Sequence, residues 1–165
     1  MRRKRQAGFS LVELIITVCI VAILGSIAVA QMRDYTRRAR ISEVVMALSR
    51  CKNTVTESYL TLDSAPQPGS WGCEGTGVSQ YAGSIQTSSD GVARVPVSNM
   101  DRLVDGRYIY MVPARGDGST AMTTPGDLGK SIGSWICGSD WQPVRNALPS
   151  NCRTDTSSFS FQDFR

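Results

Sequence analysis

A run of 22 residues from Phe9 to Ala30 contains no charged side chain except Glu13, and it constrains the fold more than any other part of the chain. As an α-helix, at about 1.5 Å per residue, this run is long enough to cross a hydrocarbon core about 30 Å thick. A charge in that setting costs roughly 2.5–3.5 kcal/mol, so an ionisable group inside such a segment is a candidate functional residue. Glu13 therefore needs a cationic partner.

A basic segment precedes the apolar run and is typical of a targeting sequence: Arg2, Arg3, Lys4 and Arg5, followed by Gln6-Ala7-Gly8. The next residues, Gly8-Phe9-Ser10-Leu11-Val12-Glu13-Leu14-Ile15, resemble the processing signal of type IV prepilins. The resemblance implies that residues 1–8 are a leader, which a membrane aspartyl peptidase removes between Gly8 and Phe9. It also implies that the new amine of Phe9 is N-methylated and that Glu13 is the assembly glutamate.

An ordinary secretory signal peptide is the competing interpretation, because Ala28-Val29-Ala30 fits a small-residue cleavage site. Its product would be a secreted, disulfide-bonded binding protein that begins at Gln31. A carboxylate inside the apolar part of a signal peptide serves no purpose, whereas a prepilin uses it. We therefore prefer the prepilin interpretation because of Glu13.

The net charge of +4 comes from the leader, since removal of residues 1–8 leaves 14 basic and 14 acidic side chains. The basic composition is thus poor evidence for nucleic-acid binding, which we expect at most at the level of a filament. A local basic cluster follows the apolar run, and we expect it to lie at the lipid headgroups: Arg33, Arg37, Arg38 and Arg40.

Four of the five cysteines lie beyond the apolar run, and Cys19 lies within it. An even set in a short, non-cytosolic domain indicates two disulfides in an oxidising compartment. Four cysteines allow three connectivities, of which we choose the sequence neighbours, Cys51–Cys73 and Cys137–Cys152. Because the chain has no histidine and no C-x-x-C spacing, we expect no metal site, no Ser–His or Cys–His catalytic pair, no cofactor and no enzyme activity.

Apolar residues continue at spacings of three and four beyond the run, at Ile41, Val44, Val45, Leu48, Cys51, Val55 and Tyr59. The pattern predicts one helix over 9–59, with an apolar half over 9–30 and an amphipathic half over 31–59. A Gly- and Pro-rich loop over 61–80 follows, and strands are predicted over 81–87, 92–98, 108–114 and 131–137. The fold class is α+β: a long helix packed on a small antiparallel sheet, with residues 31–165 as one globular domain.

Two further segments extend the resemblance to type IV pilins. Trp135-Ile136-Cys137 and residues 148–153 resemble the disulfide-bounded loop of major pilins, and Cys51-Lys52 with Trp71-Gly72-Cys73 resembles pilins that carry an extra disulfide. The resemblance implies a pilus subunit that polymerises with itself into a helical filament for adhesion, twitching motility or DNA uptake. It implies prepilin peptidase and the inner-membrane assembly machinery as partners, and a move from the bacterial inner membrane, with the C-terminal domain periplasmic, to an extracellular filament. A minor pilin or a type II secretion pseudopilin is the alternative within this class.

Three features lie outside the resemblance. Ala30 occupies a position where the family usually has a helix-weakening proline, so unwinding of the helix in a filament is not implied. Arg115-Gly116-Asp117 and the nearby Asp127 are interpreted as turn chemistry and not as an integrin-ligand or calcium site. Residues 154–165 carry no motif that assigns them a role.

Overall fold

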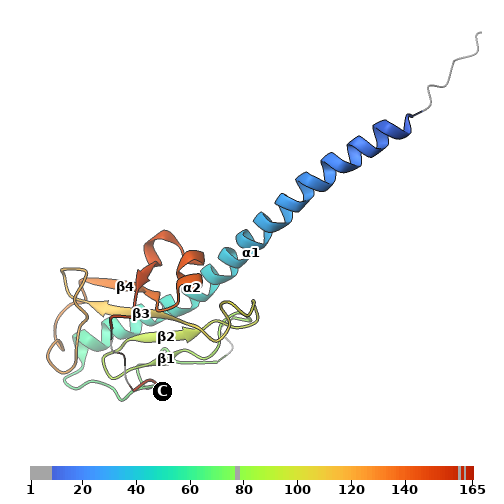
Figure 1. Ribbon diagram of the computed structural model, residues 1–165. Helices are drawn as coiled ribbons and strands as arrows, with labels where there is room; N and C mark the ends of the chain where they lie inside the picture. Colours follow the sequence, from blue (N-terminus) through green and yellow to red (C-terminus); the bar gives the residue numbers. More distant parts are fainter. Residues whose placement is uncertain (1–8, 77–78, 160, 162) are drawn as a thin grey trace, which may run out of the picture. The chain divides into compact units, whose positions relative to one another are not determined.

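The structure is a computed structural model that describes residues 9–76, 79–159, 161 and 163–165. These residues form the helices α1 (Leu11–Thr61) and α2 (Gln142–Ala147), a 3₁₀ helix η1 (Ser150–Cys152) and five strands (Figure 1). The strands are β1 (Gln86–Thr87), β2 (Ala93–Pro96), β3 (Tyr108–Ala114), β4 (Ser134–Ser139) and β5 (Thr154–Asp155). The chain divides after Thr36 into two compact units, so α1 contributes to both.

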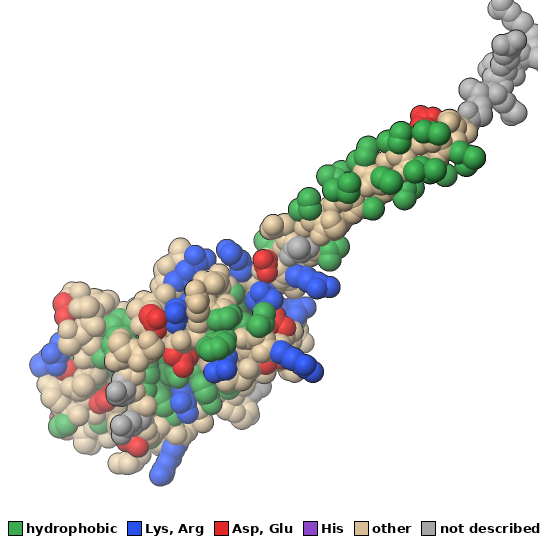
Figure 2. All heavy atoms as spheres, viewed as in Figure 1, with side chains coloured by type: hydrophobic (Ala, Val, Ile, Leu, Met, Phe, Trp, Pro, Cys, Tyr) green, Lys and Arg blue, Asp and Glu red, His purple; other side chains and the backbone are tan. Residues whose placement is uncertain are grey.

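In the first unit, α1 is long and apolar enough to cross a membrane by length and composition. Hydrophobic side chains cover the visible face of this part of the helix (Figure 2). The hydroxyl of Thr17 donates to the carbonyl of Leu14 at 2.8 Å, and the hydroxyl of Ser26 donates to the carbonyl of Ile23 at 2.7 Å. These two polar side chains are thus satisfied within the helix itself, as an apolar environment requires.

In the second unit, the predicted apolar stripe of α1 forms the centre of the core. Its fully buried members are Ile41, Val44, Leu48, Cys51, Val55 and Tyr59. They share one cluster with sheet residues that include Val95, Ile109 and Met111. Burial of a large apolar side chain stabilises a fold by about 1.5–3 kcal/mol, so this stripe is the main link between helix and sheet.

The sheet has the order β1-β2-β3-β4-β5, with antiparallel pairing up to β4 and a parallel pairing of β4 with β5. Val95 lies opposite Ile109, and Met111 lies opposite Cys137. Because side chains alternate along a strand, Ile109 and Met111 face α1, while Tyr110 and Val112 belong to a second apolar cluster on the other face. The α+β class and the packing of a long helix on a mostly antiparallel sheet are confirmed.

Several boundaries differ from those predicted. The helix begins at Leu11 and ends at Thr61, and β3 has the predicted bounds. The segment predicted as a strand over 81–87 is regular only at Gln86–Thr87, because Ala82 and Ile85 bridge to different partners, Val97 and Gly75. The strand predicted over 92–98 is regular only at Ala93–Pro96, and Val97 follows it as an isolated bridge to Ala82.

The last part of the sheet also differs from the prediction. β4 runs from Ser134 to Ser139 and not over 131–137. β5 was not predicted, because a two-residue strand whose residues are both exposed has no alternating pattern. Its parallel pairing with β4 makes the sheet mixed.

Candidate functional site

Glu13 lies in the first turn of α1, which the backbone N–H of Leu14 closes by donating to the carbonyl of Ser10 at 3.2 Å. A carboxylate in the first turn is favoured by the positive end of the helix dipole. The sequence has no lysine or arginine between Phe9 and Met32. A cation for Glu13 must therefore come from outside this segment.

The large apolar side chains around Glu13 are exposed on every side of the helix. From Phe9 to Val29 they range from 51% exposed at Leu14 to 78% exposed at Leu11. Cys19, which is exposed on the same segment, is the free cysteine among the described residues. An apolar surface that surrounds a helix belongs in lipid or against other helices. This segment is therefore the candidate site of membrane insertion and assembly.

The predicted processing site lies at the edge of what the structure describes. Gly8 lies outside the described residues, and Phe9 is exposed and precedes the helix. The structure holds a single chain. Cleavage after Gly8, methylation of Phe9 and pairing of Glu13 with another subunit therefore stay predictions.

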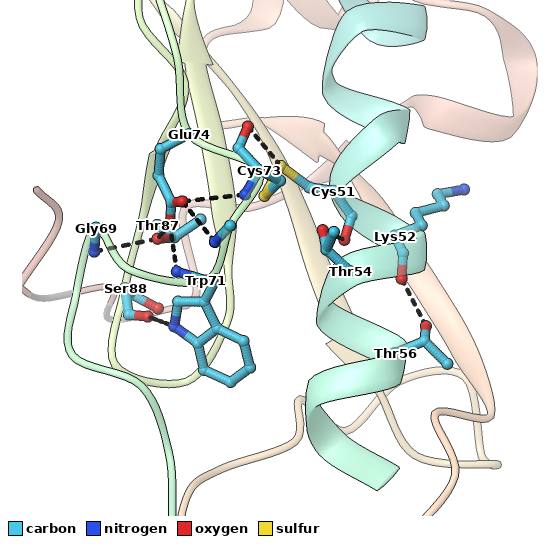
Figure 3. Close-up of a disulfide and its surroundings, with 11 residues drawn as sticks. Cys51, Lys52, Thr54, Thr56, Gly69, Trp71, Cys73, Glu74, Thr87 and Ser88 are labelled. Atoms are coloured by element: carbon cyan, nitrogen blue, oxygen red, sulfur yellow. Dashed lines mark hydrogen bonds between the residues drawn. A yellow bond between two sulfur atoms is a disulfide. The ribbon is translucent and has the colours of Figure 1, made fainter. Parts of the chain in front are cut away.

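The Cys51–Cys73 disulfide joins α1 to the loop that follows it, with 5.0 Å between the two Cα atoms (Figure 3). Trp71 is buried beside it and stacks on Tyr59, with 5.6 Å between the ring centroids. The indole N–H of Trp71 donates to the carbonyl of Ser88 at 2.8 Å. A covalent bond and a buried aromatic pair thus hold the same loop on the helix.

Glu74 folds this loop around its carboxylate. It accepts backbone N–H bonds from Trp71 at 2.7 Å, from Gly72 at 2.8 Å and from Cys73 at 3.0 Å, and the hydroxyl of Thr87 also donates to it (Figure 3). Burial raises the pKa of Glu74, but the hydrogen bonds to its carboxylate, led by those from Thr87 and Trp71, together outweigh burial and leave this pKa below its ordinary value. The charged carboxylate is therefore the form that organises the turn.

The Cys137–Cys152 disulfide joins β4 to η1 and encloses α2, with 4.4 Å between the two Cα atoms. Within this loop Leu148 is fully buried, and its carbonyl accepts a hydrogen bond from Nε of Arg153 at 2.7 Å. Both disulfides join the sequence neighbours that we chose among the three connectivities. The globular unit thus has two covalent closures, one on α1 and one at the end of the sheet.

The segment that contains Arg115 is built around the buried carboxylate of Asp127. Arg115 and Lys130 each form an ion pair with this carboxylate at 2.9 Å, and the backbone N–H of Thr123 donates to it at 3.0 Å. Asp117 instead accepts the backbone N–H bonds of nearby turn residues at 3.0 Å. In the described residues, no group of three or more His, Cys, Asp or Glu side chains is arranged to hold a metal ion.

Two family models match the chain. The model for pilins, the subunits of a bacterial filament, matches residues 37–153. The model for the prokaryotic N-terminal methylation motif matches residues 3–29. The second match covers the segment that a secretory cleavage after Ala30 would remove, which goes against the secreted alternative.

The most similar relatives include type IV pilins and fimbrial proteins. The chain is 30% identical over 157 residues to the type IV major pilin protein PilE of Neisseria gonorrhoeae, a match that covers 92% of this chain and 84% of that protein. It is 31% identical over 150 residues to a fimbrial protein of Neisseria meningitidis, with coverage of 85% and 75%. It is 28% identical over 159 residues to the fimbrial protein EcpC of Eikenella corrodens, with coverage of 93% and 94%. The chain therefore belongs to the type IV pilin family.

Proposed function

We propose that this chain is the precursor of the structural subunit of a type IV pilus and that it polymerises through the first half of α1. The observation that carries this proposal is the apolar segment whose large side chains are exposed on every side, with the single carboxylate of Glu13 in its first turn. Packing of such helices against each other buries this surface, and each Å² of buried apolar area stabilises the assembly by about 25 cal/mol. The family match and the major-pilin relatives support the same role.

Maturation creates the surface that polymerises. We propose that a prepilin peptidase removes residues 1–8 by cutting between Gly8 and Phe9, and that the new amine of Phe9 is then N-methylated. The match of residues 3–29 to the methylation-motif model supports this step. Before the cut, the basic residues Arg2 to Arg5 hold this end of the helix at the cytoplasmic face, because moving four charges into an apolar core is too costly.

Glu13 then pairs with the Phe9 amine of an adjacent subunit. Support comes from the absence of lysine and arginine between Phe9 and Met32, which leaves a backbone amine as the nearest available cation in a core of identical helices. Removal of one partner from a buried ion pair costs about 3–5 kcal/mol. The pair would therefore set the register between subunits.

The division of the chain follows from this role. Residues 9–30 form the membrane segment and later the filament core, and residues 31–165 form the periplasmic and then extracellular domain, where disulfides persist. The inner-membrane assembly machinery is the further partner, and the filament would serve adhesion, twitching motility or DNA uptake. The role is structural, and the C-terminal disulfide with the major-pilin relatives favours a major subunit over a minor pilin or a secretion pseudopilin.

Mass spectrometry of the chain from sheared surface filaments tests the proposal. We expect an abundant chain that begins with N-methylated Phe9. A mature chain that begins at Gln31, or absence from the filaments, would contradict it. Gly8→Val should leave full-length precursor in the inner membrane and abolish filaments, whereas Ala7→Val, next to the cut, should be processed normally.

A further inference from the structure

The face of the sheet that points away from α1 also carries a buried apolar cluster, smaller than the one that packs on the helix. Tyr110, Val112 and Ala114 of β3 are buried there together with Val92 and Ile136. Burial on both faces requires a second cover besides α1. The described residues of the segment 156–165, which we call the C-terminal strap, supply that cover through Phe159, Phe161 and Phe164.

Aromatic contacts attach the strap to β3. Phe161 stacks on Tyr110, with 4.9 Å between the ring centroids, and Phe159 stacks on Phe161 at 5.5 Å. The guanidinium carbon of Arg94 lies 4.3 Å from the ring centroid of Tyr108 and 3.9 Å from that of Phe164. Aromatic pairs and cation–π contacts are each modest in strength, so the strap is held by several weak contacts acting together.

The strap also covers the outer edge of β1. The backbone N–H of Thr87 donates to the carbonyl of Arg165 at 3.3 Å, and the N–H of Arg165 donates back to Thr87 at 3.4 Å. Gly69 makes room for this pairing, because its φ is +78° and a Cβ there would lie 3.1 Å from Arg165. Figure 1 shows the C-terminal end beside β1. The backbone N–H of Gly69 also donates to the Thr87 carbonyl at 3.2 Å, so the strap shares this edge with the loop and is the partner of the Thr87 N–H.

We propose that the C-terminal strap is an assembly-specificity element that keeps a second copy of this chain off the outer face and the β1 edge of the sheet. An apolar sheet face and an unpaired strand edge both invite association with other chains. The relevant partner is a second copy, because polymerisation brings copies of the chain to high local concentration. The strap lies beyond residue 153, where the match to the pilin family model ends.

This inference rests on the proposed function, in which copies associate through the first half of α1. The test therefore uses the full chain in detergent micelles with Glu13→Ala in every sample, so that pairing through Glu13 is removed from the start. Phe161→Ser/Phe164→Ser is compared with Leu103→Ser, which changes an exposed apolar residue outside the strap. Analytical ultracentrifugation measures the association of each sample, and hydrogen exchange measures the protection of the Thr87 amide.

We expect the Leu103→Ser sample to be monomeric and the strap variant to associate at concentrations at least tenfold lower. Exchange of the Thr87 amide should be at least tenfold faster in the strap variant diluted to monomer, and a synthetic peptide of residues 156–165 should restore the monomer. A strap variant that stays monomeric, or that associates without faster exchange at Thr87, would overturn the proposal. Loss of protection throughout β3 in the double variant would show that it unfolds. In that case Arg94→Ala, which removes the contact to Phe164, is tested by the same two measurements.

Discussion

The carboxylate of Glu74 accepts a hydrogen bond from the backbone N–H of Cys73 at 3.0 Å, so this acid holds the residue that is disulfide-bonded to Cys51. The same carboxylate accepts the N–H groups of Trp71 and Gly72, which places three successive donors on one side chain. The turn is therefore specified by an acid as well as by a covalent bond. The carboxylate and the disulfide thus hold the same loop.

Replacement of Glu74 by alanine should lower the free energy of unfolding by about 2 kcal/mol, because it leaves partly buried backbone donors without their charged acceptor. Denaturant unfolding of the full chain in detergent, with both disulfides intact, measures the change. Glu57→Ala is the matched control, since Glu57 is an exposed acid on α1. Equal losses from the two substitutions would show that the Glu74 turn does not stabilise the fold.

Gly91 should not tolerate a side chain. Its φ is +69°, and a Cβ there would lie 2.9 Å from Cγ1 of Val55 and 3.0 Å from the ring of Trp71. We expect Gly91→Ala to lower the free energy of unfolding by about 1–3 kcal/mol, from left-handed backbone strain together with displaced packing. Gly75→Ala is the control, because a Cβ at Gly75 meets nothing within 4 Å. Thermal unfolding of both variants and of the unmodified chain measures the loss, and equal stability of the two variants would contradict the prediction.

Asp127 should make the stability of the globular unit depend on pH. Hydrogen bonds from Lys130 and Arg115 hold the pKa of this carboxyl well below its ordinary value of about 3.9. A group with a lowered pKa in the folded state stabilises the fold above its unfolded pKa, and this contribution is lost as the pH falls through the folded pKa. Asp127→Asn should therefore cost about 2 kcal/mol at pH 7 and progressively less below about pH 4.

Unfolding curves of the Asp127→Asn variant and the unmodified chain between about pH 2 and pH 7 check this expectation. The pKa of Glu74 is also lowered in the folded chain, so Glu74 adds a pH dependence of the same sign. Both chains contain Glu74, and the difference between their free energies of unfolding therefore isolates the effect of Asp127. Asp63→Asn, at an exposed acid, serves as the control. If the difference in free energy of unfolding between Asp127→Asn and the unmodified chain did not change with pH, the proposed role of the charged carboxylate would be wrong.

The long helix and the class of the fold could be predicted because their signals are local. The stripe from Ile41 to Tyr59 repeats every three or four residues, since each of its members packs on one sheet face. β3 is readable as a strand because its bulky and β-branched residues are buried on both faces. The neighbouring cysteine pairs are close in sequence, so proximity alone favoured them.

Three features could not be predicted: the strap, β5 and the Glu74 turn. The strap and the Glu74 turn have partners that are distant in sequence, and β5 is too short to show a pattern. The contact of Phe161 with Tyr110 spans about fifty residues, and no periodicity in residues 154–165 names that partner. The hydroxyl of Thr87 donates to the carboxylate of Glu74 across 13 residues, and no spacing in the sequence indicates that these two residues are close. The closely spaced Phe159, Phe161 and Phe164 were the available signal for an apolar cover, but the sequence does not show that the outer face of β3 is the surface they cover.

Loss of the charge at Glu13 should block assembly and leave processing intact. Glu13→Gln keeps the shape of the side chain but cannot balance the Phe9 amine of an adjacent subunit, which leaves a buried cation unpaired at about 3–5 kcal/mol per subunit. That cost corresponds to a fall in filament yield of at least about a hundredfold, since each 1.4 kcal/mol is a factor of ten. Because we propose that the peptidase cuts between Gly8 and Phe9, away from Glu13, the mature chain should still begin at methylated Phe9. Electron microscopy and the mass of the membrane-held subunit measure the two effects, and Thr17→Val, which removes a hydroxyl bonded within its own helix, should assemble normally. Filaments in normal number from Glu13→Gln would refute the pairing.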